Sequence, residues 1–169
     1  MIHIYTGEGK GKTTTCIGLT VRASGAGKRV LFTQFCKNGN SSEVAVLKQI
    51  PNITYQCADK AFGFYSKMTE EQKIDAKKNY TTMLDAIIQQ SSAYDMIVLD
   101  EIIFAYNMHL VDNETLLNFL RNIPSSLEVV LSGRSPSDEL VALADYVSNV
   151  QKLKHPFDQG VQARKGIEY

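Results

Sequence analysis

The sequence has no excess charge of either sign and no long apolar run. Lysine plus arginine and aspartate plus glutamate number 18 each among the 169 residues, so the formal net charge is zero. A neutral chain lacks the basic surface on which broad binding to nucleic acid or to anionic membranes depends. Its apolar runs fall far short of the ~20 residues that span a bilayer. We therefore expect neither nucleic acid nor a membrane as a partner.

Cysteine is also scarce. Cys16, Cys36 and Cys57 are odd in number and show no C-x-x-C spacing, which argues against a disulfide framework or a zinc site and favours a reducing compartment. Met1 leads directly into a β-rich stretch, without the basic segment and cleavage signal of a leader peptide. These absences predict a cytoplasmic protein.

What the sequence does contain is an alternation of apolar strand-like runs and helical periodicity. The length fits one domain, since domains cluster at roughly 100–150 residues, and there is neither an internal repeat nor a low-complexity linker. Strands are predicted over 2–5, 28–35, 52–57, 95–101 and 125–133. Helices are predicted over 12–23, within 68–92, over 113–121 and within 135–147. We expect a single domain, 1–169, ending in an extended tail, 151–169.

Two of the predicted helices carry start signals. Thr69 and Gln72 fit a capping box, and Ser135 is the expected cap of the later helix, with Pro136 at its first position and Asp138 in its first turn. The apolar face of the longer helix is expected to comprise Ile74, Met83, Leu84, Ile87 and Ile88. The predicted strands show little polar alternation, which is typical of a parallel sheet with helices on both faces.

The stretch T-G-E-G-K-G-K-T-T at 6–14 lies between the first predicted strand and the first predicted helix. A phosphate chain can be wrapped by backbone N–H groups where glycines keep side chains away, and a helix N-terminus favours anions. Gly7, Gly9 and Gly11 would give the room, Lys12 the positive charge and Thr13 a hydroxyl for Mg²⁺.

This loop departs in one place from the strict pattern G-x-x-x-x-G-K-[ST]. The pattern wants glycine at position 6, where this chain has Thr6, with Gly7 one place later. A glycine-rich turn with solvated lysines is the alternative interpretation. The strand, loop and helix nevertheless lie where the motif needs them, and they predict an α/β fold of the phosphate-loop NTPase (RecA-like) kind. We expect a three-layer sandwich with a mostly parallel central sheet of five to six strands.

An acidic pair, Asp100 and Glu101, follows the apolar run I-V-L. Such a pair is ordinarily a solvated loop, but the carboxyl ends of parallel strands are where ligands bind in open α/β sheets. We therefore expect a Mg²⁺ site with a nucleoside triphosphate. Glu101 could also act as a base. No guanine-reading N-K-x-D and no obvious lid of arginines is present, so the residues alone define a Mg-dependent nucleotide enzyme or motor and leave the reaction open.

Several longer segments of the sequence indicate which family of nucleotide enzymes the chain resembles. T-G-E-G-K-G-K-T-T, R-A-S-G-A-G-K-R-V-L-F-T-Q-F-C-K-N-G, V-L-D-E-I, S-G-R and the closing K-H-P-F-D-Q-G-V-Q-A-R-K-G-I-E-Y resemble the corrinoid adenosyltransferase family. This is the phosphate-loop type of ATP:cob(I)alamin adenosyltransferase, and the resemblance covers nearly the whole chain in the family's order.

The resemblance implies transfer of the 5′-deoxyadenosyl group of Mg-ATP to Co(I) of a corrinoid, with release of triphosphate, in adenosylcobalamin synthesis or salvage. It implies catalytic and metal-binding roles for Lys12, Thr13, Asp100 and Glu101. The implied nucleotide-binding residues are Gly7, Glu8, Gly9, Lys10, Gly11, Lys12, Thr13, Thr14 and Arg22. A homodimer, and an electron donor such as a reduced flavoprotein, are expected partners.

The family uses aromatic side chains, in a motif like G-F-x-W, to displace the lower ligand of cobalt. In the string A-F-G-F-Y-S-K, Phe64 follows Gly63, but Ser66 stands where the motif has tryptophan, with Tyr65 beside it. Phe64 and Tyr65 are the expected corrinoid-binding residues, and a buried aromatic cluster that includes Phe62 is the alternative.

Three other residues invite a functional interpretation. Arg134 is expected to approach the corrinoid or the phosphates, with a surface salt bridge as its alternative. His155 is expected to make a structural hydrogen bond, and Cys16 to lie in the core. The competing functions are a small kinase or NTPase on the same scaffold, and a non-catalytic, ATP-dependent corrinoid carrier.

Overall fold

The computed structural model describes residues 1–60 and 62–169. Its strands are β1 (Ile2–Thr6), β2 (Val30–Gln34), β3 (Ile53–Cys57), β4 (Met96–Asp100), β5 (Glu128–Ser132) and β6 (Tyr146–Asn149). Its α-helices are α1 (Lys12–Gly25), α2 (Ser42–Leu47), α3 (Glu70–Gln89), α4 (Ile102–Asn107), α5 (Asn113–Arg121) and α6 (Asp138–Leu143). Short 3-10 turns cover Tyr65–Lys67, Ser91–Ala93 and Pro156–Gln159.

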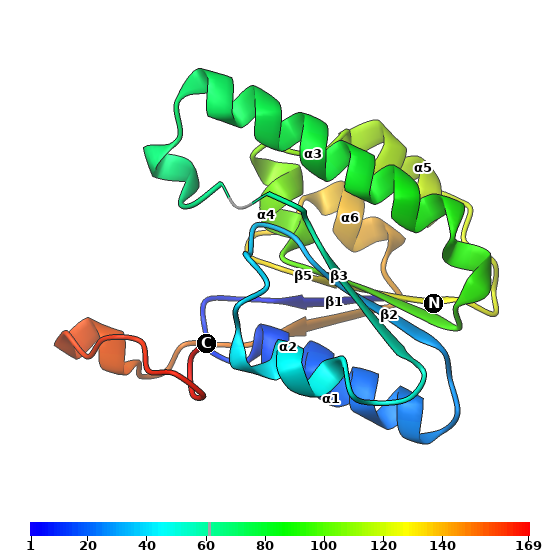
Figure 1. The fold of residues 1–169 in the computed structure, drawn as a ribbon, viewed down its shortest axis with the longest axis horizontal. Coiled ribbons are helices and arrows are strands. Elements are labelled where there is room, and N and C mark those ends of the chain that lie inside the picture. Colours follow the sequence, from blue (N-terminus) through cyan, green and yellow to red (C-terminus); the bar gives the residue numbers. More distant parts are fainter. Residues whose placement is uncertain (61) are drawn as a thin grey trace.

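The strands form one sheet of six in the order β3-β2-β4-β5-β1-β6. Every pair is parallel, with Gln34 opposite Asp100 between β2 and β4, and Tyr5 opposite Ser132 between β1 and β5. The carboxyl ends of all strands therefore lie at one edge of the sheet, which is on the left in Figure 1. The predicted parallel α/β fold is confirmed.

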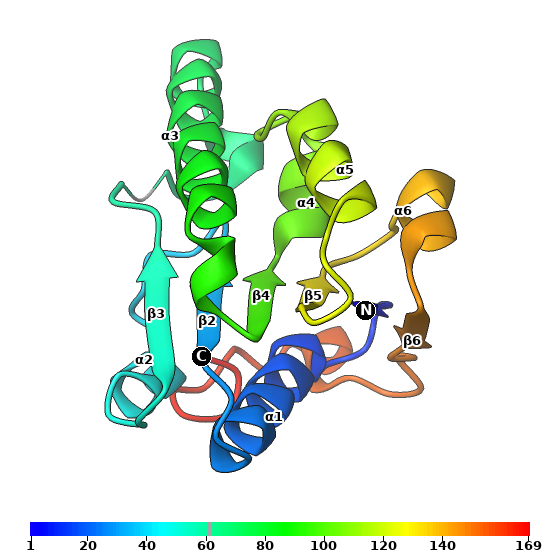
Figure 2. The ribbon, with the colours of Figure 1, turned by 90° about the vertical axis from the view of Figure 1, so that its right-hand side faces the viewer.

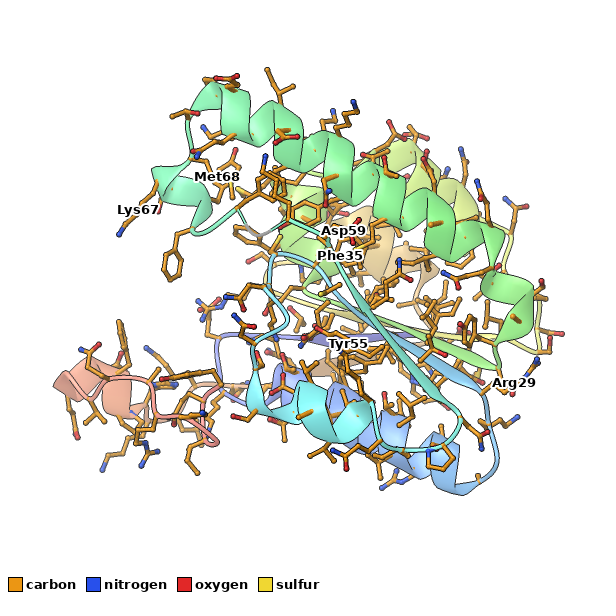
Figure 3. The ribbon with its side chains drawn as sticks, in the orientation of Figure 1. Arg29, Phe35, Tyr55, Asp59, Lys67 and Met68 are labelled. Atoms are coloured by element: carbon orange, nitrogen blue, oxygen red, sulfur yellow. The ribbon has the colours of Figure 1, made fainter. Side chains whose placement is uncertain are left out.

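Helices cover both faces of the sheet. Figures 1 and 2 show α1 and α2 below it and α3, α4, α5 and α6 above it. Successive strand residues point to opposite faces, so Ile97 and Leu99 of β4 pack with the upper helices while Met96 and Val98 pack with the lower ones. In Figure 3, Phe35 and Tyr55 lie on these opposite sides of the sheet. The result is the predicted three-layer sandwich.

Helix α3 begins with the predicted capping box. The backbone N–H of Gln72 donates to Thr69 Oγ1 at 3.2 Å, and the N–H of Thr69 donates to Gln72 Oε1 at 2.9 Å. Ile74 was predicted on the buried face but is 72% exposed, so that prediction is wrong. Ala76 and Tyr80 take the inward positions instead, because residue 74 lies two places, about 200° around the helix, from residue 76.

The region 135–149 also departs from the prediction. Ser137, not Ser135, caps α6, since its Oγ accepts from the N–H of Leu140 at 3.3 Å. Ser135 instead has a left-handed backbone, with φ 51°. The helix is short, and the chain that follows it forms the unpredicted strand β6. Because β6 is an exposed edge strand, its residues carry no apolar pattern.

After β6, residues 151–169 contain no α-helix or strand and one 3-10 turn. This segment lies at the carboxyl edge of the sheet, near the start of α1, as Figure 1 shows. The hydroxyl of Ser42, at the start of α2, donates to the carbonyl of Tyr169 at 3.0 Å. The end of the chain is thereby held against α2.

Candidate active site

The loop between β1 and α1 closes around the side chain of Lys12. The Lys12 ammonium is buried and donates to the carbonyl of Gly7 at 2.7 Å and to that of Gly9 at 3.0 Å. Burial, followed by the nearby charge of Arg134, lowers the pKa of Lys12. The positive charge of Lys12 thus lies beside the N-terminus of α1, where the unpaired N–H groups of the first turn favour an anion.

The glycines of this loop have a second role that the sequence did not reveal. A Cβ at Gly7 would lie 2.2 Å from Asn149 Oδ1 and 2.4 Å from the carbonyl of Val150, and one at Gly9 would lie 2.6 Å from the carbonyl of Gln151. The N–H of Gly9 donates to the carbonyl of Val150 at 2.7 Å. Glycine is thus required at both positions for the loop to pack against the chain leaving β6.

Asp100, at the end of β4, gathers the polar groups of the site and is fully buried. Its carboxylate accepts from Thr13 Oγ1 at 3.1 Å, from Ser132 Oγ at 2.6 Å and from Gln34 Nε2 at 3.2 Å. The ammonium of Lys37 lies 2.8 Å from Asp100 Oδ2. The structure therefore brings the loop and the acidic strand end together and adds Lys37, for which the sequence predicted no role.

Glu101 follows in a left-handed backbone conformation, with φ 62°, which costs a non-glycine residue about 1–3 kcal/mol. Its N–H donates to Ser132 Oγ at 3.0 Å. Burial raises the pKa of Glu101, as does the charge of Asp100, while Lys37 and Lys12 act in the opposite direction. A second carboxyl group is thereby held beside Asp100 and within reach of the cations of the site.

The donor atoms at this point fit a hard divalent cation. A hydroxyl from Thr13 and carboxylates from Asp100 and Glu101 are oxygen ligands, the kind that Mg²⁺ prefers. Over residues 1–60 and 62–169, no cluster of three or more His, Cys, Asp or Glu side chains could hold a metal ion. An ion here would therefore complete its shell with phosphate oxygens and water, as Mg²⁺ usually does.

The outer part of the loop faces the tail and β5. Arg134 Nη1 lies 2.6 Å from Glu8 Oε2, with both side chains more than half exposed. The salt bridge that was the alternative interpretation of Arg134 is therefore present, and it holds Arg134 at the loop. Lys10 Nζ lies 3.5 Å from Glu168 Oε1. The charged residues of the loop are thus paired across its rim.

Arg22 is not part of this group. It lies in the last turn of α1, ten residues after Lys12, which is about 15 Å along the helix axis. This exceeds the reach of its side chain, so the prediction that Arg22 contacts the phosphates is corrected. Thr14, by contrast, lines a cavity beside the loop.

The predicted aromatic residues separate into two environments. Phe64 is 77% exposed, whereas Tyr65 meets Phe104 edge-on at 6.1 Å between ring centroids. Phe62 meets Tyr80 edge-on at 5.7 Å. The aromatic-cluster interpretation therefore applies to Phe62 and Tyr65, which pack partly buried against the core, and not to Phe64. Ala61, the first residue of the quoted string, lies outside the described residues.

A cavity of about 310 Å³ lies beside these aromatic rings. It is lined by Cys36, Lys37, Asn38, Ser41, Phe62, Gly63, Phe64 and Tyr80. A second cavity, of about 600 Å³, opens beside the loop. It is lined by Thr13, Thr14, Ile17, Lys37, Ser41, Ser42, Glu43, Gly166, Ile167, Glu168 and Tyr169. Lys37 and Ser41 line both, so the segment between β2 and α2 separates an aromatic space from a phosphate-loop space.

The two remaining predictions concern structural residues. His155 Nδ1 accepts from the N–H of Phe157 at 3.1 Å, which confirms a structural hydrogen bond at the start of the last 3-10 turn. Cys16 is fully buried among the residues beneath the sheet, which confirms its place in the core. Burial raises the pKa of Cys16 strongly, so the thiol is not a reactive group.

Fold and site together define the class. A parallel sheet, a glycine-rich loop around a buried lysine and an acid at a nearby strand end make this a phosphate-loop NTPase-like domain. The same fold occurs in EssC (ATPases 2 and 3) from Geobacillus thermodenitrificans, with a TM-score of 0.53 and 14% identity over 98% of this chain. The chain spans 34% of that structure, and the likeness concerns the fold alone.

Sequence comparison gives the family. Residues 1–169 match the family described as ATP:corrinoid adenosyltransferase BtuR/CobO/CobP. Corrinoid adenosyltransferase CobA of Salmonella typhimurium is 32% identical, and the corrinoid adenosyltransferase of Escherichia coli K12 is 30% identical; each comparison covers 100% of this chain and 85% of the relative. The chain belongs to the corrinoid adenosyltransferase family and is a transferase. In the described part of the chain, no helix is long and apolar enough to cross a bilayer.

Proposed function

We propose that this transferase moves the 5′-deoxyadenosyl group of ATP to Co(I) of a corrinoid and releases inorganic triphosphate. The observation that carries the proposal is the shared wall of the two cavities. A phosphate-loop space and an aromatic space meet at Lys37 and Ser41. A reaction that joins a nucleotide carbon to the metal of a large, flat macrocycle needs two such adjoining spaces.

The chemistry asks for positioning rather than for a protein nucleophile. Cobalt supplies the electron pair of the new Co–C bond and becomes Co(III), while the C5′–O5′ bond breaks and its electrons leave on the triphosphate. The protein must therefore hold ATP with its ribose carbon toward cobalt and stabilise the negative charge that grows on the leaving oxygen.

The residues of the loop suit the second task. Backbone N–H groups of 10–14 and the ammonium of Lys12 bind phosphate oxygens, with Thr14 at the edge of the nucleotide space. The N–H of Gly9 is already paired with the carbonyl of Val150. Mg²⁺, when bound, neutralises part of the triphosphate charge. Thr13 and Asp100 would hold it, with Glu101 as a further oxygen ligand or as a partner of its water. Ser132 and Gln34 orient the Asp100 carboxylate through the hydrogen bonds they donate to it.

The aromatic space suits the corrinoid. Phe64, at the rim, has the exposure that supports contact with a large ligand, and we propose that it displaces the lower ligand of cobalt. Tyr65 packs on Phe104 and would stiffen this segment, with Arg134 meeting the polar periphery of the corrin. Burial raises the pKa of Cys36 to about 12, so the thiol in this cavity stays protonated and does not compete as a cobalt ligand.

The wider setting is proposed on the family resemblance. We propose a single domain, 1–169, with the tail 151–169 beside the nucleotide space, that acts as a homodimer in the cytoplasm. A reduced flavoprotein would supply the electrons that generate Co(I). The role would lie in adenosylcobalamin synthesis or salvage.

The test is an anaerobic assay of the purified protein with Mg-ATP and cobalamin reduced to Co(I). Loss of the Co(I) absorption bands with one triphosphate formed per cobalt supports the proposal. ADP or orthophosphate with an unchanged cobalt spectrum would indicate a kinase or NTPase instead, and binding of both ligands without turnover would indicate a carrier. Lys12→Ala should abolish turnover, whereas Lys78→Ala, an exposed lysine of α3, serves as the matched control.

A further inference from the structure

Lys37 is a charged residue of the site to which the proposed reaction assigns no role. Its ammonium lies 2.8 Å from Asp100 Oδ2 and 3.1 Å from Thr13 Oγ1. These are two of the oxygen groups that fit Mg²⁺. A lysine ammonium and a divalent cation cannot share the same two oxygen atoms, so one must leave when the other arrives.

The backbone places Lys37 at this point. The N–H of Phe35 donates to the carbonyl of Asp100 at 2.9 Å, which keeps the end of β2 beside the end of β4. Cys36 then turns the chain with a left-handed φ of 55°. Gly39 also has a left-handed backbone conformation, and a Cβ at this position would lie only 3.0 Å from Cys57 Sγ. The close approach between Lys37 and Asp100 is therefore built into the loop between β2 and α2.

The charge of Asp100 explains why a cation is needed there. The carboxylate is fully buried, and a buried charge is costly unless it is paired and hydrogen-bonded. Among the described residues, Lys37 is the basic side chain that forms an ion pair with Asp100. Lys37 thus supplies the countercharge when no divalent ion is bound.

The surroundings of Lys37 give its side chain somewhere to go. It lines the aromatic cavity and the loop cavity alike, whereas Lys12 is fixed within the loop by two carbonyl groups. We propose that Lys37 is a second triphosphate-binding cation. It pairs with Asp100 in the nucleotide-free protein and turns to triphosphate oxygens on the side of the aromatic cavity when the metal-nucleotide takes over Thr13 and Asp100.

This inference rests on the proposed function, and it assigns Lys37 to the leaving group. The bond that breaks lies between the ribose carbon and the first oxygen of the triphosphate. A cation on the wall between the two cavities is well placed for that oxygen, where negative charge accumulates as the bond breaks. Lys37 would then favour the transition state more than it favours the bound substrate.

The experiment measures binding of inorganic triphosphate with Mg²⁺ by isothermal titration calorimetry. Lys37→Met should weaken binding by at least about tenfold, because a hydrogen bond to a charged group is lost. Lys37→Arg should keep the affinity within about threefold, and Lys78→Met, the matched control on α3, should bind as the wild type does. Mg²⁺ alone should bind more tightly to Lys37→Met than to the wild type, since no lysine competes with it.

A second comparison guards against misfolding of the single variant. Asp100→Asn removes the buried charge, so Lys37→Met in the Asp100→Asn background leaves no unpaired carboxylate. The double variant should bind triphosphate about tenfold more weakly than Asp100→Asn alone. Equal affinity in either pair would overturn the role of Lys37 and leave the proposed function standing. A wild-type protein that binds neither Mg-ATP nor triphosphate would overturn both.

Discussion

The packing of the phosphate loop against the chain leaving β6 makes Gly9→Ala an informative perturbation. The added Cβ would lie 2.6 Å from the carbonyl of Gln151 and 2.8 Å from that of Val150. Both are backbone atoms, so relief requires the loop and the tail to separate. Overpacking of this kind costs about 1–3 kcal/mol, and weakening the 2.7 Å bond from Gly9 N–H to Val150 adds about 0.5–1.5 kcal/mol.

The expected loss of unfolding free energy is therefore about 1.5–4.5 kcal/mol. For a chain of this size the melting temperature should fall by about 3–18 °C. Gly18→Ala is the matched control, because Gly18 lies within α1 with nothing within 4 Å of the added Cβ. It should stabilise the protein by about 0.5–1 kcal/mol. Thermal and urea unfolding measure both, and a Gly9→Ala protein as stable as the wild type would refute the packing argument.

Three single side chains test other parts of the molecule. Thr69→Ala removes the α3 cap and should cost about 1 kcal/mol by urea unfolding; an unchanged midpoint would contradict the capping role. Because burial raises the pKa of Glu101 above 4.5, the folded protein binds its proton more tightly than the unfolded chain does. Protonated Glu101 therefore stabilises the folded protein at low pH. This contribution is lost as the pH rises through the pKa that Glu101 has in the folded protein. Glu101→Gln should thus melt higher than the wild type at pH 7, with the gap closing in acid, while turnover is lost; a gap that widens in acid would reverse this sign. Phe64→Ala, at an exposed position, should leave the melting temperature unchanged and slow the reaction from Co(II) more than that from Co(I). Equal slowing in both assays would make Phe64 a general binding residue.

The parts of the fold that the sequence could predict are those written in contiguous residues. The apolar run ending in Asp100 and the glycine loop ending in Lys12 are each local patterns, and both elements were predicted correctly. β6 was missed because an exposed edge strand needs no apolar alternation. Ile74 was wrongly predicted to be buried because Ala76 and Tyr80 of the same helix occupy the inward face instead.

Lys37 could not be predicted for a different reason. Its partner is 63 residues away in the chain, and the contact depends on the register that sets Gln34 opposite Asp100. It also depends on the left-handed turn at Cys36, a conformation that cysteine rarely adopts and that no sequence pattern signals. The countercharge of the site is thus a property of the assembled sheet.

The strand order explains why the site needs Ser132 in addition to the phosphate loop and Asp100. β1 and β4 are not neighbours, because β5 lies between them. Thr13 must therefore reach Asp100 across the end of β5, and Ser132 fills that end. Its Oγ donates to Asp100 at 2.6 Å and accepts from the N–H of Glu101 at 3.0 Å. One hydroxyl thus fixes the orientation of the first carboxylate and the backbone of the second, so the geometry of the acidic pair depends on the strand between them.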